Sequence, residues 1–452
     1  MADFPFTSTE QQNAQRTYLH ETVVNYQNAS DVFGMAEDWK DTPINDIGVK
    51  VPLEISPNPS LKVVNLDGGS VPQAQARDLD NMTVNYGQLM AGSGVTYEAM
   101  LNNRKETAGD VLAQGIESDA RQFVKFLNDY ASRGDGTAAL ATASANYLGT
   151  DATTKRTFVA NGSTDSIGPS QVVVGGWYQI FDSTGATQRV TADVESTGFA
   201  VASSYQVESK TAANIVFTSG TELPTDYVSG DILVPVIGTT NAATGFIAGL
   251  PYIIDSAGTY FGKSRSSVTA LQAFENALGG ALTAGELMET YSNVQQRGGY
   301  FGSDSLIDQL MILVNVTQNT NYYNLSLSSG AAVGGIHQLR SDGQGKPKYD
   351  LGYASMQFTW FGAPIKVCNS LRGDEIYFVN KKALKKAILK NVGEVGHGFG
   401  KTMLVNSSGV PTLVEATYRD FVGQFFSPTP HRLGKISGIT ITNLPTQKAS
   451  MV

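Results

Sequence analysis

Segment 393–402, GEVGHGFGKT, invites comparison with a phosphate-binding loop. Such a loop follows a strand and needs a glycine five places before its Gly-Lys-Thr glycine, so that backbone amides can curl around phosphates. Here that position holds Val395, and the preceding sequence predicts a helix. A dinucleotide fingerprint fails as well, because Lys401 stands where its third glycine belongs. We therefore expect a surface loop without a ligand.

The histidines and the single cysteine could bind metal or attack a substrate. No two histidines stand at the i, i+4 spacing of a helix-borne metal site. Cys368 lies in an apolar strand context, PIKVCNS, with no base to activate it and no partner for a disulfide. Carboxylates show no pairing for acid–base work. We expect a core cysteine, no metal, no cofactor and no enzyme activity. The histidines are His20, His337, His397 and His431.

One basic cluster stands out in the region 380–391, which we predict to be a helix. Leu384 and Ile388 would form its inward side, and the lysines would form a solvated face. The alternative is contact with acidic patches of a neighbouring molecule, or weak contact with DNA. No aromatic residues are interleaved, as they are in many nucleic-acid readers. The lysines are Lys381, Lys382, Lys385, Lys386 and Lys390.

The length and amino-acid composition limit the classes of protein to which the chain can belong. The chain has 452 residues, enough for one large or two to three ordinary domains, and 41% are hydrophobic, enough for a substantial core. The net charge of -9 means that the chain as a whole lacks the excess of positive charge typical of nucleic-acid-binding proteins. The start, MADFPFTSTEQQNAQ, does not have the pattern of a signal peptide, and no apolar run is long enough to span a bilayer. We expect a soluble protein made in a reducing compartment.

The first 100 residues predict elements that cannot fold alone. A helix capped by Ser8 or Thr9 is followed by an extended arm interrupted by four prolines. Two strand-like runs, LKVVNL and MTVNYGQLM, then predict a long hairpin with a turn at Asp67-Gly68-Gly69. Because arm and hairpin carry few apolar residues, we expect them to lie on neighbouring copies of the chain.

The next segments predict one long helix and a β-rich insertion. Residues 104–131 place Leu112, Ile116, Ala120, Phe123, Leu127 and Tyr130 on one stripe, and the helix ends at the glycine stop Gly134-Asp135-Gly136-Thr137. Between 150 and 240, short alternating strands with Gly and Ser turns predict a small β-barrel or sandwich. Because helical sequence flanks this part on both sides, we interpret it as an insertion.

Beyond residue 240 the pattern is mixed α+β. Helices are predicted near 268–278, 283–297, 304–312 and 380–391. Strands are predicted at QFTWFG, PIKVCN, EIYFV, VGQFFS and KISGITIT.

This order of parts resembles the Hong Kong 97-type fold of tailed-bacteriophage major capsid proteins. Local text is similar as well: the Gly-Asp-Gly-Thr turn after the long helix, the later Gly249-Leu250 step, TAGELMETYSNVQQRGG, and QFTWFGAPIKVCNSLRGDEIYFV with its strand pair. The resemblance covers most of the chain outside 138–240. It implies an α+β fold with an N-terminal arm (1–60), an extended β-hairpin loop (61–100), a spine helix (101–137), a β-rich insertion (138–240), a peripheral domain (241–285), an axial domain (286–400) and peripheral closing strands (401–452).

The implied function is a structural one. The chain would self-assemble, as pentamers and hexamers, into the icosahedral shell that encloses phage double-stranded DNA without sequence-specific binding. Portal and scaffolding or decoration proteins are the other implied partners, no membrane is involved, and the protein would be assembled in the host bacterial cytoplasm and reside in the virion. No catalytic, cofactor or metal residue is expected. The candidate subunit-interface residues are Asp67, Gly68, Gly69, Arg77, Arg104, Lys382 and Lys386.

Other structural roles remain open at this point. A secreted or surface-layer protein would share the Gly, Ser and Thr richness, but should carry an export signal. A tail-tube or decoration protein is usually shorter and lacks a long spine helix. An enzyme would need a deep polar pocket with paired, perturbed groups.

Overall fold

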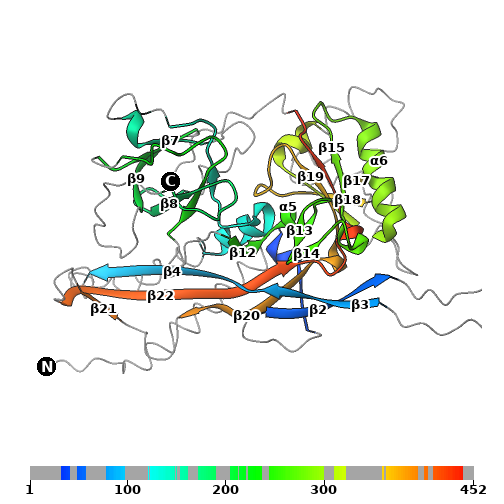
Figure 1. The fold of residues 1–452 in the computed structure, drawn as a ribbon, viewed down its shortest axis with the longest axis horizontal. Helices are drawn as coiled ribbons and strands as arrows, with labels where there is room; N and C mark the ends of the chain where they lie inside the picture. Colours follow the sequence, from blue (N-terminus) through cyan, green and yellow to red (C-terminus); the bar gives the residue numbers. More distant parts are fainter. Residues whose placement is uncertain are drawn as a thin grey trace, which may run out of the picture.

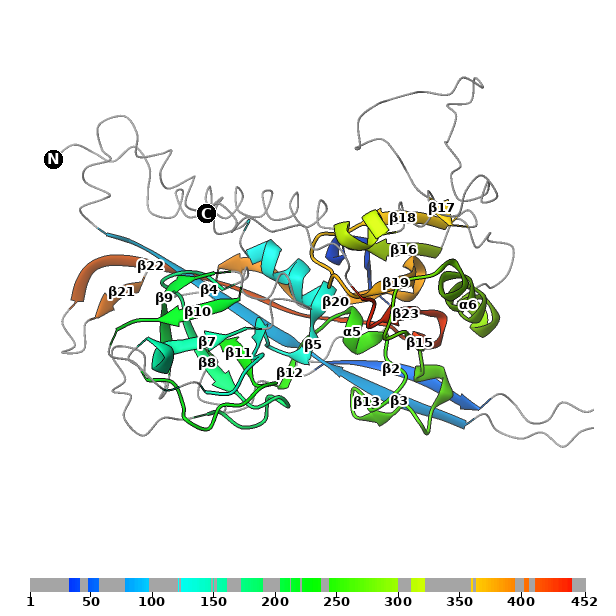
Figure 2. The same ribbon diagram turned by 90° about the horizontal axis from the view of Figure 1, so that it is seen from above.

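The computed structural model shows an α+β protein with a long, narrow sheet along one side (Figure 1). On this sheet a β-barrel and a second, helix-covered sheet stand side by side (Figures 1 and 2). The structure describes residues 32–40, 48–56, 78–96, 121, 123–147, 149, 153–160, 172–189, 204–211, 213–219, 222–236, 244–299, 310–321, 359–360, 363–394, 402–405 and 411–440.

The long sheet is built around one sixteen-residue strand, β22 (Pro411–Phe426), which pairs along its length with β4 (Gly87–Thr96), β20 (Lys385–Glu394) and β21 (Thr402–Val405). A two-residue strand, β1 (Glu37–Asp38), adds in parallel to the far edge of β20.

A separate ribbon of β2 (Gly48–Ser56) and β3 (Asp78–Asn85) continues the line of the long sheet. Only Tyr86 separates β3 from β4, so residues 78–96 form one extended segment along the whole side of the molecule (Figure 2). At about 3.3 Å per residue this segment spans roughly 60 Å.

The ribbon corrects the prediction of an unpaired arm before residue 60. Val49, Val51 and Leu53 alternate with exposed residues and are buried in the main core, together with Met82 and Val84 of β3. This period of two is the pattern of a strand with one covered face. Exposed Pro52 does not interrupt it, because β2 has a partner on one edge only among the described residues. The predicted strand LKVVNL and the Asp67 turn lie outside the described residues.

The predicted long helix is confirmed where the structure describes it, at Arg121 and residues 123–133. Phe123, Leu127 and Tyr130 face the core, as their spacing predicts. The helix ends against a tight crossing of two glycines, where Gly249 N donates to Gly134 O over 2.9 Å. A Cβ on Gly134 would lie 2.6 Å from Tyr130 O, so only glycine fits there.

The chain leaves the body through β5 (Asp135–Thr137) and returns through β12 (Thr244–Ala248), which pair antiparallel as a stalk. Between them, six antiparallel strands follow the order β6-β11-β8-β9-β10-β7. The end strands meet at the Ala143–Ala160 bridge, which closes a small barrel as the sequence predicts. The strands are β6 (Ala141–Thr142), β7 (Thr157–Val159), β8 (Trp177–Phe181), β9 (Tyr205–Lys210), β10 (Asn214–Phe217) and β11 (Ile232–Pro235).

The second sheet has the order β15-β23-β19-β16-β18-β17 and is buried on both faces. Helix α6 (Ala284–Val294), capped by Thr283, packs on one face through Leu287, Tyr291 and Val294. The other face joins the main core. The strands are β15 (Phe274–Ala277), β16 (Leu310–Val314), β17 (Thr359–Trp360), β18 (Ala363–Val367), β19 (Ile376–Asn380) and β23 (Gly434–Ser437).

Several predicted helices are wrong, although α6 and the five predicted strands of the C-terminal half are confirmed. Residues 380–391 form the short turn η6 (Lys381–Ala383) and strand β20, residues 268–278 form η3 (Thr269–Leu271) and β15, and residues 310–312 belong to β16. The remaining short elements are η1 (Phe33–Met35), η2 (Thr154–Arg156), α5 (Leu250–Ile253), β13 (Thr259–Tyr260), β14 (Lys263–Ser264), η4 (Gln295–Gly299) and η7 (Pro430–Arg432).

Candidate functional site

The two open edges of the extended segment are the most distinctive surface of the chain. Among the described residues, β3 pairs only with β2 and β4 pairs only with β22, so the opposite edge of each has no strand beside it. Met90 on β4 is 53% exposed. Unpaired N–H and C=O groups along such an edge are a template for another chain.

The lysine cluster lies on η6 and strand β20, and its three strand lysines pair with acidic residues of the same chain. Lys385 Nζ lies 2.5 Å from Glu37, Lys386 Nζ lies 3.6 Å from Asp38, and Lys390 pairs with Asp420. For two of these lysines the acidic partner is β1 of the same chain, where the alternative prediction was an acidic patch of a neighbour. Of the interface candidates, Lys386 is half-buried against its own N-terminal segment, while Lys382 is exposed.

The same N-terminal segment, residues 32–39, is fixed to its own body. Phe33 packs edge-on against Phe421 at 5.9 Å, and Trp39 against Phe426 at 5.5 Å. This corrects the expectation that the arm as a whole lies on a neighbour. The other interface candidates, Asp67, Gly68, Gly69, Arg77 and Arg104, lie outside the described residues.

Sequence reasoning missed the residue that organises this attachment, Asn128. Its Oδ1 accepts from the backbone N–H of Val32 at 3.0 Å and of Phe33 at 3.3 Å, and its Nδ2 donates to Ser370 Oγ at 3.1 Å. Asn128 therefore joins the long helix, the N-terminal segment and the loop before β19. A polar residue beside the helix's apolar stripe was the available signal, but nothing in the sequence names its partners.

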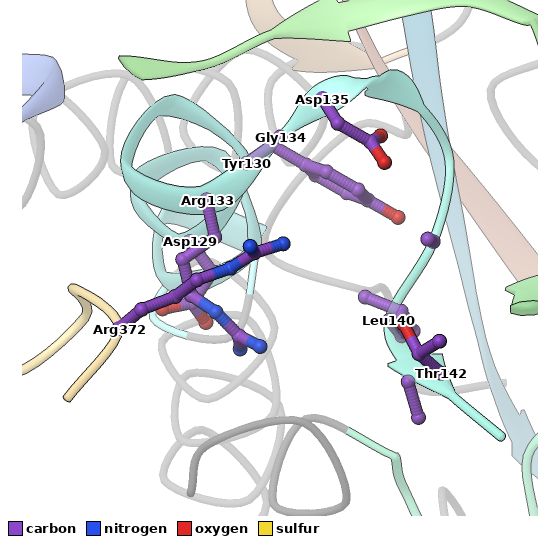
Figure 3. Close-up of a pocket in the computed structure, with 10 residues that line it drawn as sticks. Asp129, Tyr130, Arg133, Gly134, Asp135, Leu140, Thr142 and Arg372 are labelled. Carbon is purple, nitrogen blue, oxygen red and sulfur yellow. The ribbon is translucent and has the colours of Figure 1, made fainter. Parts of the chain in front are cut away.

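A small hollow lies where the long helix meets the start of the barrel (Figure 3). Arg133 and Arg372 extend into it from two elements, with the carboxyl group of Asp129 beside them and Leu140 and Thr142 across from them. Burial raises the pKa of Asp129 to about 7, although Arg133 and Lys125 lower it. The hollow is lined by Asp129, Tyr130, Arg133, Gly134, Asp135, Ala139, Leu140, Ala141, Thr142 and Arg372.

The lining residues offer two hydroxyl groups, those of Tyr130 and Thr142. The same residues include no His, Cys or Ser, and the hydroxyl of Tyr130 donates to Ala138 O. The pKa of Tyr130 is raised, mainly by burial, which makes it a poorer acid.

The remaining chemistry candidates also have structural surroundings. Cys368 is buried, as predicted. His431 Nδ1 lies 2.9 Å from Ala270 O, and the other three histidines lie outside the described residues. Segment 393–402 follows strand β20, not the helix we expected, and leads into strand β21, where a phosphate-binding loop would open a helix.

Two further features concern the described part of the chain. Its side chains bring together no group of three or more His, Cys, Asp or Glu suited to a metal ion. None of its helices is both long and apolar enough to cross a membrane.

No protein-family model matches the chain, and no curated protein matches it significantly. Solved structures do resemble it. "Cyanophage A-1(L) capsid asymmetric unit" is 12% identical, covers 90% of this chain and 91% of that chain, and has a TM-score of 0.46. "Gordonia phage Cozz" is 10% identical, covers 90% of this chain and 86% of that chain, and has a TM-score of 0.42. "Capsid of native GTA particle computed with C5 symmetry" is 9% identical, covers 90% of this chain and 89% of that chain, and has a TM-score of 0.39. At these scores the structures are ones that the chain resembles, and family membership remains a proposal.

Proposed function

We propose that the protein is the major capsid protein of a tailed bacteriophage, with a Hong Kong 97-type fold, and that it acts as a shell subunit and not as an enzyme. Many copies would form pentamers and hexamers and close into an icosahedral shell around double-stranded DNA. It would assemble in the bacterial cytoplasm and reside in the virion, with portal and scaffolding or decoration proteins as further partners.

The observation that carries the proposal is the extended segment 78–96 with its open edges. It runs along the whole molecule, and the ribbon of β2 and β3 reaches the end opposite the barrel (Figure 1). A projection at one end and a distinct body at the other favour head-to-tail contacts, which form closed rings when the rotation between neighbouring copies closes, and open filaments when it does not. Each contact can stay weak, because a subunit that touches several neighbours gains by multivalency.

The parts of the chain can be assigned to this role with several revised boundaries. We propose an arm before residue 48, an extended loop that begins with β2, a spine helix that ends at Arg133, and the barrel as an insertion carried by the β5–β12 stalk. The second sheet with α6 would be the axial domain, and β22 would belong to the peripheral domain.

The charge distribution supports enclosure of DNA without tight binding. The net charge is -9, and Lys385, Lys386 and Lys390 face carboxylates of their own chain. Such paired lysines release few counterions on contact with phosphates, so their contribution to DNA affinity is small.

The test replaces the segment that joins the two strands of the ribbon and leaves β2 and β3 intact. Ser56 and Asp78 are directly opposed in the β2–β3 register, so Asn-Gly can replace residues 57–77 as a two-residue turn. We expect the shortened chain to fold, with thermal unfolding close to that of the wild type, because the buried face of β2 is retained. Electron microscopy should show no closed shells.

Normal closed shells from the shortened chain would contradict a role of the segment between β2 and β3 in contacts between subunits. Long open tubes from the wild-type chain would instead favour a tail-tube protein.

A further inference from the structure

We propose that the hollow beside the end of the long helix binds a small oxyanion, held between Arg372 and Asp129. This inference is independent of the proposed shell function, because it concerns the interior of one subunit.

The first observation is a pair of buried polar atoms that lack hydrogen-bond partners and line the same hollow. Arg372 Nε, a donor, and Asp129 Oδ2 are both buried without a partner. Asp129 as a residue is only 7% exposed. Buried groups of this kind are rare in proteins, because each costs about 1–3 kcal/mol.

The second observation is the grouping of positive charge. Arg133 comes from the last turn of the helix and Arg372 from the loop before β19, and both extend into the hollow (Figure 3). Burial, and then the charge of Arg372, lower the pKa of Arg133 to about 10, whereas the pKa of Arg372, which burial lowers, is raised overall by the negative charges of Glu375, Tyr377 and Asp135. An anion between the two guanidinium groups would relieve this repulsion, and guanidinium forks match the geometry of oxyanions.

Asp129 suits an anion site only in its protonated form. With its pKa raised to about 7 by burial, the carboxyl group carries a proton over much of the neutral range and can donate it in a hydrogen bond. Binding should therefore weaken as the pH rises through 7.

The other charged groups around the hollow lie on the long helix, on β5 and in the loop before β19. Lys125 lies on the helix, and Asp135 on β5 accepts from Thr137 N and Oγ1. Beyond Arg372, Glu375 lies 3.7 Å from Arg372 and accepts from the hydroxyl of Tyr377, while Asp374 has a pKa raised mainly by burial. Glu375 contacts a terminal nitrogen of Arg372, which leaves its Nε for the hollow.

A bound oxyanion would link three parts of the fold. Asp129 and Arg133 belong to the helix, Arg372 to the loop before β19, and residues 139–142 to the entry of the barrel. Occupancy would therefore stabilise the position of the barrel's base on the body.

The experiment measures the thermal unfolding of the full-length protein in sulfate against chloride at equal ionic strength. Sulfate keeps its charge between pH 6 and pH 8, but it also stabilises proteins generally, so Arg372→Gln supplies the baseline. At pH 6 we expect sulfate to raise the midpoint of the wild type by about 2 °C more than that of Arg372→Gln, with a smaller difference at pH 8. Lys50→Gln, which removes an exposed positive charge, should behave as the wild type does.

A second variant keeps the proposal testable if Arg372→Gln fails to fold. Asp129→Asn keeps a donor at every pH, so it should retain the sulfate effect and lose its pH dependence. The same measurement with acetate in place of sulfate distinguishes the two kinds of oxyanion that could bind. An equal rise in the unfolding midpoint indicates a carboxylate, such as an acidic side chain. A rise with sulfate alone indicates a free tetrahedral anion. Equal sulfate shifts in the wild type, Arg372→Gln and Asp129→Asn at both pH values would overturn the proposal.

Discussion

Asp129 gives the fold a stability that depends on pH. Burial raises its pKa to about 7, and a carboxyl group whose pKa is higher in the folded than in the unfolded protein destabilises the fold when it ionises. Its contribution is therefore full below about pH 4, the unfolded value, and is lost as the pH rises through about 7.

We predict that Asp129→Asn removes this loss. Relative to the variant, the free energy of unfolding of the wild type should fall by up to roughly 4 kcal/mol between pH 4 and pH 8. Urea unfolding in chloride buffers checks this, with Glu289→Gln on the exposed face of α6 as the control. Parallel pH profiles for the wild type and Asp129→Asn would contradict the burial of an ionisable Asp129.

Phe33 anchors the N-terminal segment to the body. Its ring is 2% exposed, and it packs against Phe421 while Lys386 Nζ lies 5.0 Å from the ring centre. Phe33→Ala should destabilise the protein by about 3–5 kcal/mol, because it leaves a cavity in the main core. Met288→Ala on α6, where the side chain is exposed, should cost less than about 0.5 kcal/mol. The midpoints of denaturant unfolding measure both effects. A midpoint of Phe33→Ala equal to that of the wild type would mean that the N-terminal segment does not pack on its own body.

For single residues, the sequence predicts whether a side chain is buried better than it predicts which residues that side chain contacts. Cys368 was predicted to be a core residue from its apolar neighbours, and it is buried. The partners of Lys385 and Asn128 were not predictable, because Glu37 and Val32 are distant in sequence and only the tertiary fold brings them close.

The barrel closes on itself, although most of its buried side chains are continuous with the main core. Phe158, Ile180, Tyr205, Ile215 and Phe217 are buried, and the closure at Ala143–Ala160 leaves no free edge between β6 and β7 there. We predict that residues 138–243 fold as an isolated fragment, with a β-type circular dichroism spectrum and cooperative unfolding. A fragment that is unfolded at room temperature would show that the barrel depends on the body.

Strand β20 shows why one predicted helix failed. KKALKKAILK has apolar residues at a spacing of four and strong helix formers, so local preference favours a helix. In the fold the segment lies between β1 and β22, and the hydrogen bonds of two neighbouring strands outweigh that preference. The barrel strands were predictable because Gly and Ser turns separate short alternating runs, a signal that needs no tertiary context.

For the whole molecule, the main regions of helix and strand were partly predictable and their contacts were not. The α+β class, the C-terminal part of the long helix and the β-rich region follow from local periodicity, and the described residues confirm them. The pairing of β2 with β3, and of β4 with β22 more than 300 residues away, depends on long-range closure that periodicity does not encode.

Self-assembly of the wild-type chain is the central claim, and electron microscopy of the purified protein, combined with sedimentation, tests it most directly. We predict round, closed shells of uniform diameter and a boundary that sediments far ahead of a single chain. A single, concentration-independent monomer, with no shells or ring-shaped capsomers on the grids, would contradict it.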